Sequence, residues 1–253
     1  MTETLSLRAK IEQSPMGAYQ WMIVVMAAIM NLLDGFDVLA LAFTATAIRS
    51  EFGLTGIELG YLLSAGLFGM TAGSLFLAPL ADKIGRRPLL LMAVSLSAIG
   101  MLGSAFISQY QWLGFWRVIT GLGVGGILVG TNVITSEYSS RKWRSFAISV
   151  YAAGFGIGAV LGGMFAVMLQ GEYGWRSVFL AGAILTGLLL VILFIWLPES
   201  IDFLTSKQPK NAEVRLNLIA KKIGLAGDWK LPEKAEKIKK FIVDHYNFEE
   251  TLV

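Results

Sequence analysis

The sequence is poor in the residue types that most enzymes and metal sites use. It contains no cysteine and one histidine, His245. Disulfides, thiolate metal sites and histidine-based catalytic triads are therefore excluded. Charged residues make up only 15% of the chain, against about 25% in a typical soluble domain. We expect neither an enzyme nor a site for a metal or a cofactor.

Apolar residues are correspondingly frequent. The chain is 55% hydrophobic and has a mean hydropathy of +0.63, which points to a membrane. About half of the charged residues follow Leu197, so an embedded region precedes a polar tail. The basic residues lie where membrane topology places them, so we expect no nucleic-acid partner despite a pI near 9.1.

Long uncharged runs predict an all-α membrane protein, because a helix of roughly 20 residues crosses a ~30 Å hydrocarbon core. Two short apolar runs flank "DGFD" and make one full span when joined through it; a short first helix followed by an interfacial loop is the alternative. Six transmembrane helices are predicted, at 19–46, 57–78, 88–107, 112–136, 145–169 and 177–197. Residues 1–18 then form a cytoplasmic N-terminus, 19–197 the transmembrane domain and 198–253 a cytoplasmic linker or tail.

Basic residues in the short loops set the expected orientation. Of the basic residues in the loops, Arg49 and Arg176 alone fall on one side of the predicted membrane. The other side holds Arg8, Lys10, Lys83, Arg86, Arg87, Arg141, Lys142 and Arg144. By the positive-inside rule both termini are cytoplasmic. No cleavage pattern follows the first apolar run, so we expect no separate signal peptide.

The two halves of the apolar region resemble each other. A shift of 89 residues superimposes the first three helices on the last three and places Gly69 and Gly73 on Gly158 and Gly162. An odd number of spans inverts the second copy. The pattern indicates a 3+3 inverted repeat, as in secondary transporters.

Two aspartates lie inside the first predicted helix. Asp34 and Asp37 share one helix side, with Asn31 one turn earlier. A charge at bilayer depth costs roughly 2.5–3.5 kcal/mol, so such residues usually face a water-filled cavity. Low dielectric and a like-charged neighbour favour a protonated carboxyl group, which makes the pair candidate proton carriers. A purely structural pair is the alternative.

Arg117 is the only basic residue inside a predicted span. Its guanidinium stays charged and matches a carboxylate in bidentate geometry. It could bind an anionic substrate, pair with the two aspartates, or extend its charged end toward the outer surface.

Glycines recur four residues apart within the predicted helices. "GLGVGG" at 121–126 matches a dinucleotide-binding pattern, but it lacks the preceding strand and the later acidic residue. Such spacing instead favours close packing between helices. The candidate packing positions are Gly69, Gly73, Gly121, Gly125, Gly158 and Gly162.

Two charged loops lie on the predicted cytoplasmic side. They contain Asp82, Lys83, Gly85, Arg86 and Arg87 in one loop, and Glu137 and Arg144 around the other. Ion pairs there could latch one conformation of a transporter, although surface pairs contribute only about 0–1 kcal/mol and the loops could merely anchor topology.

The tail contains two amphipathic patterns. Residues 211–224 predict a short helix with Asn211 as its cap and Val214, Leu218 and Ile219 on one face. Residues 232–246 predict a second, with Pro232 in its first turn.

Three segments resemble the signature segments of the major facilitator superfamily, in order: "LADKIGRR", "RVITGLGVGG" and "LPES". "DGFD" and the long segment at 66–88 further resemble its aromatic acid:proton symporter branch. The resemblance covers about 15–205, with departures at Ala78, Ile201 and Asp202. It implies transport roles for the residues that match the branch, which are Asp34, Asp37, Asp82, Arg86, Arg87, Arg117 and Glu137.

The resemblance also implies an activity and partners. It implies symport of protons with aromatic or related carboxylic acids across the inner membrane, by alternating access within the lipid bilayer. The family has twelve helices, so we expect a missing C-terminal six-helix half, or in second place a second copy of the chain. Alternatives are a transporter of sugars or other metabolites and a membrane receptor or assembly protein that does not transport.

Overall fold

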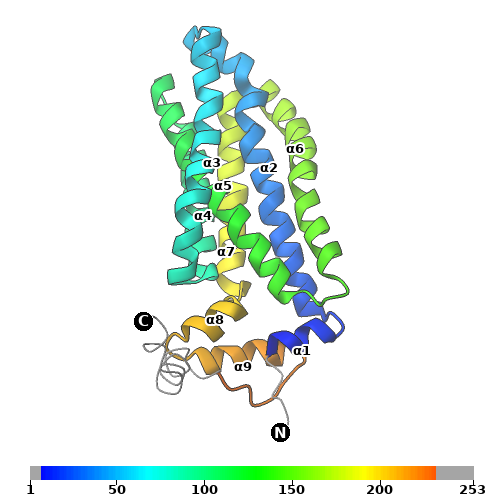
Figure 1. The fold of residues 1–253 in the computed structure, drawn as a ribbon. Coiled ribbons are helices and arrows are strands. Elements are labelled where there is room, and N and C mark those ends of the chain that lie inside the picture. Colours follow the sequence, from blue (N-terminus) through cyan, green and yellow to red (C-terminus); the bar gives the residue numbers. More distant parts are fainter. Residues whose placement is uncertain (1–6, 232–253) are drawn as a thin grey trace, which may run out of the picture.

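The computed structural model describes residues 7–231, which form an elongated helical bundle without strands (Figure 1). Six helices are long and apolar enough to cross a membrane, so the predicted all-α, six-span fold is confirmed. They are α2 (Ala18–Phe52), α3 (Gly56–Ile84), α4 (Arg86–Ala105), α5 (Tyr110–Tyr138), α6 (Arg144–Tyr173) and α7 (Trp175–Trp196). Three short helices accompany them, α1 (Leu7–Gln13), α8 (Ile201–Lys207) and α9 (Ala212–Ile223).

Helix α2 continues without a break through the two aspartates. Its 35 residues extend roughly 50 Å at 1.5 Å per residue, which is longer than a bilayer core. The alternative of a short first helix followed by a loop is therefore wrong. The helix ends at Gly53, whose φ of 64° lies in the left-handed region that glycine adopts without steric cost.

The arrangement of the helices follows the sequence repeat. Helix α3 packs along α5, and α6 packs along α2, while α4 lies against α7. Exchanging α2 with α5, α3 with α6 and α4 with α7 maps this pattern onto itself. A single glycine with positive φ joins α3 to α4 and α6 to α7, and these glycines, Gly85 and Gly174, are also 89 residues apart.

Glycines bring the paired helices into backbone contact. A Cβ atom added at Gly158 would overlap the carbonyl of Leu32, and one at Gly69 would overlap the carbonyl of Val118. Three further candidate packing positions meet backbone carbonyls of neighbouring helices, Gly73 at Leu122, Gly121 at Gly66 and Gly125 at Met70, whereas Gly162 meets the side chain of Phe36. These approaches hold α3 to α5 and α2 to α6.

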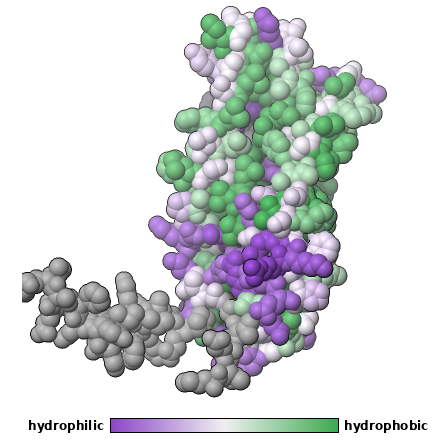
Figure 2. Space-filling view, turned by 45° about the vertical axis from the view of Figure 1, so that its right-hand side comes forward, coloured by the Kyte–Doolittle hydropathy of each residue, from purple (hydrophilic) through white to green (hydrophobic). Residues whose placement is uncertain are grey.

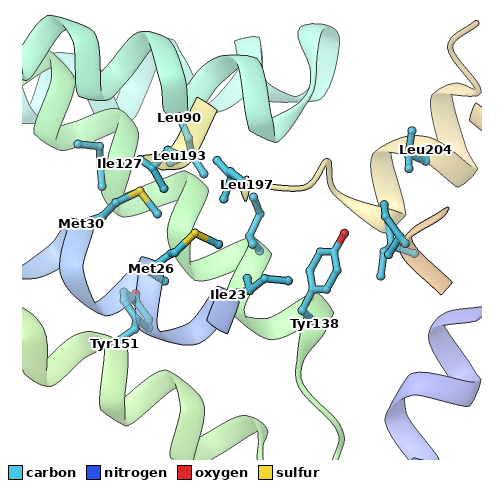
Figure 3. Close-up of a cluster of buried hydrophobic side chains, with 14 of the residues drawn as sticks. Ile23, Met26, Met30, Leu90, Ile127, Tyr138, Tyr151, Leu193, Leu197 and Leu204 are labelled. Atoms are coloured by element: carbon cyan, nitrogen blue, oxygen red, sulfur yellow. The ribbon is translucent and has the colours of Figure 1, made fainter. Parts of the chain in front are cut away.

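One end of the bundle carries the three short helices (Figure 1), and we call it the polar end. Hydrophobic side chains cover the body of the bundle, whereas hydrophilic side chains gather in a band toward this end (Figure 2). A buried cluster connects the two parts, with Tyr138 of α5 and Leu197 after α7 between the bundle and Leu204 of α8 (Figure 3). The short helices are thus packed onto the bundle.

The tail differs in part from its prediction. Helix α9 is present, but Val214 and Leu218 are exposed, while Leu216 and Ile219 are buried against the rest of the chain. Asn211 precedes the helix without a side-chain capping bond. The face was misassigned because docking selects a narrower set of apolar residues than spacing alone suggests. The second predicted helix, 232–246, lies outside the described residues.

Candidate functional site

The two aspartates of α2 are buried within the bundle, each with about 1% of its surface exposed. Asp37 accepts a hydrogen bond of 2.5 Å from the hydroxyl of Ser97 on α4, and its Oδ1 has no partner. The Asp34 side chain makes no hydrogen bond within residues 7–231, and its Oδ2 is fully buried. One turn earlier, the Asn31 amide donates to the carbonyl of Tyr151 on α6 at 2.8 Å. The carboxyl groups therefore retain unused hydrogen-bonding capacity.

Arg117 of α5 points into the bundle and is only 3% exposed, so it does not extend to the outer surface. Its guanidinium donates to the hydroxyls of Ser104 and Thr120 at 3.0 Å and packs over the ring of Phe179 at 4.8 Å. It also reaches the main-chain carbonyl of Asp37 at 3.4 Å. Among the described residues it forms no ion pair with either aspartate, so neutral groups hold this cation.

A small cavity of about 30 Å³ lies beside Asp37 and Arg117, between α2, α3 and α5. Thr120 is the other polar side chain in its wall, and Gly66 and Gly121 leave room at the helix contact. A cavity of this volume has room for at least one water molecule. The cavity thus joins a carboxyl group and a guanidinium across a space for water, and a larger ligand requires the helices to move.

We call the four residues Asn31, Asp34, Asp37 and Arg117 the membrane centre. Chemically, it can bind an anion at the guanidinium and exchange protons at the carboxyl groups. The residues between 7 and 231 contain no cluster of three His, Asp or Glu side chains that could hold a metal ion.

The loop between α3 and α4 is bound to the end of α7. Asp82 near the end of α3 and Arg86 at the start of α4 form an ion pair of 2.6 Å across the turn. The backbone N–H of Arg87 donates to the carboxylate of Glu199 at 3.0 Å, and the Arg87 guanidinium donates to the Phe194 carbonyl at 2.6 Å. A Cβ at Gly85 would meet the same Glu199 carboxylate at 2.6 Å, so the turn fits closely around it.

Lys83, by contrast, is exposed and has no assigned contact in the described part of the chain. Of the predicted loop residues, it is the one that the structure leaves outside this network.

Within residues 7–231, Glu137 forms no hydrogen bond or ion pair with the α3–α4 turn. Its buried carboxylate accepts hydrogen bonds of 2.8 Å from the hydroxyl of Ser200 and the N–H of Ile201, and it thereby caps the start of α8. Arg144 instead pairs with Glu12 of α1 at 2.6 Å. Arg87 and Glu137 are therefore linked through the segment 198–202, whereas Arg144 is linked to α1.

Several residues of the two sites were not predicted. Ser97, Ser104 and Thr120 contact the charged groups of the membrane centre, and single hydroxyls in apolar helices carry no distinctive pattern. Glu199 had a usable signal, because it lies within "LPES", one of the segments on which the family resemblance rests. Glu12 had none, since its partner Arg144 is 132 positions away.

The Major Facilitator Superfamily model matches residues 27–239. The chain belongs to this superfamily. It is 34% identical to the 4-hydroxybenzoate transporter PcaK of Pseudomonas putida over 92% of this chain and 52% of the relative. It is 36% identical to the gallate transporter of the same species over 81% of this chain and 45% of the relative.

Both relatives are named as transporters, and neither as an enzyme. This chain spans about half the length of the curated relatives that it matches. Among solved structures, the proton:xylose symporter XylE of E. coli gives a TM-score of 0.74 at 21% identity, over 92% of this chain and 55% of that chain. This likeness bears on the fold: the superfamily member described here is a multi-pass membrane protein.

Proposed function

We propose that the chain forms one half of a proton-coupled symporter for aromatic or related carboxylic acids. The observation that carries the proposal is the membrane centre, where the buried Asp37 carboxyl group, whose Oδ1 has no hydrogen-bond partner, shares a cavity wall with the buried Arg117 guanidinium, and the equally buried Asp34 lies one turn earlier. The 4-hydroxybenzoate and gallate transporters among the relatives support an aromatic acid as substrate.

In this proposal Asp34 and Asp37 carry the protons. An ionised carboxylate inside a bilayer is costly. Proton uptake therefore makes the substrate-loaded centre easier to close off from water, and proton release favours reopening of the empty centre to water. Ser97 holds Asp37 in place by its hydrogen bond. Asp34 has no such partner among the described residues, so its proton exchanges with whichever aqueous side is open.

Arg117 supplies the positive charge for the substrate carboxylate. Its present partners are hydroxyls, a carbonyl and an aromatic ring, and a substrate carboxylate is a stronger acceptor than any of these. Binding therefore exchanges neutral partners for a charged one. The cavity must widen for this exchange, which is the movement expected of alternating access.

The α3–α4 loop, Glu199, Glu137 and Arg144 form the latch at the polar end, which faces the cytoplasm of an inner-membrane protein in this proposal. Few residues of the membrane-spanning parts of α3 and α6 are buried, and both helices expose apolar side chains. These exposed faces can pack against a second domain that completes the transport pathway. A C-terminal six-helix half provides that domain, or in second place another copy of this chain.

Uptake of radiolabelled 4-hydroxybenzoate tests the proposal. The polypeptide is purified from its own membrane, whatever its length, and reconstituted into liposomes with an imposed proton gradient. Asp34→Asn and Asp37→Asn should each reduce gradient-driven uptake to less than about a tenth, because a neutral amide cannot carry the proton. Asp228→Asn, which changes an exposed aspartate outside the bundle, should leave uptake unchanged.

Undiminished uptake in both buried-site variants would contradict the assignment of proton coupling to Asp34 and Asp37. Uptake that is insensitive to the proton gradient in the unaltered protein would favour facilitated diffusion instead.

A further inference from the structure

A hollow of about 250 Å³ lies at the polar end, where the bundle meets α9. Residues from four helices and from the segment after α7 line it, so it is built from parts of the chain that are distant in sequence. They are Tyr19 of α2, Arg87 of α4, the segment 195–199, and Arg215, Leu218, Ile219 and Lys222 of α9. Of these residues, the latch at the polar end includes Arg87 and Glu199, and the membrane centre includes none.

The hollow carries an excess of positive charge. Arg87, Arg215 and Lys222 face one carboxylate, that of Glu199. The Glu199 carboxylate is already occupied by backbone N–H groups at 2.9–3.0 Å, including that of Arg87. Within residues 7–231 none of the three cations belongs to an ion pair. Two positive charges therefore remain uncompensated beside this hollow.

Two of the three cations, Lys222 and Arg87, are positioned by weaker partners. Lys222 places its ammonium over the ring of Tyr19, 5.3 Å from the centroid. Arg87 uses one guanidinium nitrogen, Nη2, on the carbonyl of Phe194, and its Nη1 makes no hydrogen bond within residues 7–231. A guanidinium with unused donors beside a free ammonium matches an anion that has several acceptor oxygens, such as a phosphate group.

The rim of the hollow is apolar and lies where the membrane spans end. Ile195, Trp196 and Leu218 expose 63%, 52% and 55% of their surfaces. Helix α7 ends at Trp196, and tryptophan is enriched at the membrane–water boundary. Phe194 and Val191 continue an exposed apolar surface along α7 away from the hollow. A soluble anion would leave this surface uncovered, whereas acyl chains would cover it.

We propose that the hollow binds the headgroup of an anionic phospholipid of the phosphatidylglycerol type. The phosphodiester lies against Arg215, Lys222 and the free donors of Arg87, and the acyl chains follow the outer face of α7. Basic pockets between membrane helices are suited to anionic headgroups for the same electrostatic reason. A bound lipid would join α9 to the start of α4. The proposal depends on membrane insertion and not on the transported substrate.

Native mass spectrometry of the purified, delipidated full chain tests this site. Phosphatidylglycerol, phosphatidylcholine and inorganic phosphate are added back separately, and the bound molecules are counted. We expect one phosphatidylglycerol to bind at least about tenfold more tightly than phosphatidylcholine. The double variant Arg215→Gln with Lys222→Gln should lose about tenfold in phosphatidylglycerol affinity.

The matched control removes two other positive charges of the same region, Lys221→Gln with Lys230→Gln, which lie outside this hollow. It should change affinity less than twofold. A charge-preserving variant, Arg215→Lys with Lys222→Arg, should retain phosphatidylglycerol binding. That result would show that the affinity lost in the double glutamine variant reflects lost charge rather than misfolding.

Three results would overturn the proposal. Equal losses in the two charge-removing variants would mean a general surface attraction. Equal binding of phosphatidylcholine would mean that no anionic site exists. Displacement of the lipid by millimolar inorganic phosphate would assign the hollow to a soluble anion instead.

Discussion

The membrane centre and the polar end use charged side chains in opposite ways. At the polar end, the Glu137 carboxylate meets several donors at the start of α8, and the Glu199 carboxylate meets the donors of the α3–α4 turn. At the membrane centre, Asp34 lacks any partner among the described residues, and the Arg117 cation is held by neutral groups. Buried carboxylates therefore fix the structure at the polar end, whereas the carboxyl groups of the membrane centre remain available for exchange.

The centre must then obtain its order from another source, and backbone packing provides it. Asn31 can donate to the Tyr151 carbonyl because α2 and α6 touch along Gly154, Gly158 and Gly162. Contacts between glycines and backbone involve no charged groups. They can therefore position polar side chains without giving them hydrogen-bond partners. The comparison predicts that the centre is sensitive to side-chain volume and the polar end to hydrogen bonding.

The largest effect is expected from Gly158→Leu. Its Cβ would overlap the carbonyl of Leu32, which is backbone and cannot rotate away, so α2 and α6 must separate. Overpacking typically costs 1–3 kcal/mol, and a rigid obstacle places this variant at about 3 kcal/mol or above. Thermal unfolding in mild detergent measures the loss.

Gly156→Leu is the control, because an added Cβ at Gly156 meets nothing within 4 Å. It lies two positions away on the same helix and should leave the unfolding temperature nearly unchanged. Similar losses in both variants would contradict the claim that contact with α2, rather than glycine content of α6, holds the centre.

An intermediate effect is expected from Glu137→Gln. A carboxamide keeps one acceptor oxygen and turns an NH₂ toward donors that now lack a partner at the start of α8. Leaving buried donors unsatisfied costs about 1–3 kcal/mol. Unfolding of the detergent-purified variant, followed by circular dichroism, should show a loss in this range.

Glu58→Gln provides the comparison, since Glu58 also caps a helix start but its capping hydrogen bonds are exposed, and glutamine can serve the capping box and accept from Tyr110 as well. Its effect should be a few tenths of a kcal/mol. If the two variants lose the same stability, burial is not what makes the polar end depend on its carboxylates.

The sequence predicts the spans and the position of the two aspartates well, because run length and hydropathy report directly on membrane insertion. It does not predict which groups Arg117 contacts, since Ser104 and Phe179 come from α4 and α7 and only helix packing brings them together. Helices α1 and α8 escape prediction for a different reason. Seven residues each are too few for a periodic pattern to stand out.

The smallest effect concerns Glu12, which joins α1 to the bundle at the polar end. The hydrogen bond from Arg144 holds the pKa of the Glu12 carboxyl below its ordinary value of 4.5. A group whose pKa is lower in the folded state adds stability above its unfolded pKa, and this contribution is lost as the pH falls through the folded pKa. Glu12 is partly exposed, so the contribution stays within about 1 kcal/mol.

The difference in unfolding free energy between the unaltered chain and Glu12→Gln isolates that contribution, because glutamine does not titrate. The unaltered chain should be the more stable at pH 7, and the difference should shrink toward zero as the pH falls below 4.5. Glu172→Gln, an exposed change on α6 outside any ion pair among the described residues, should show no such pH dependence. A difference for Glu12→Gln that stays constant down to low pH would mean that side-chain packing, and not the charge, joins α1 to the bundle.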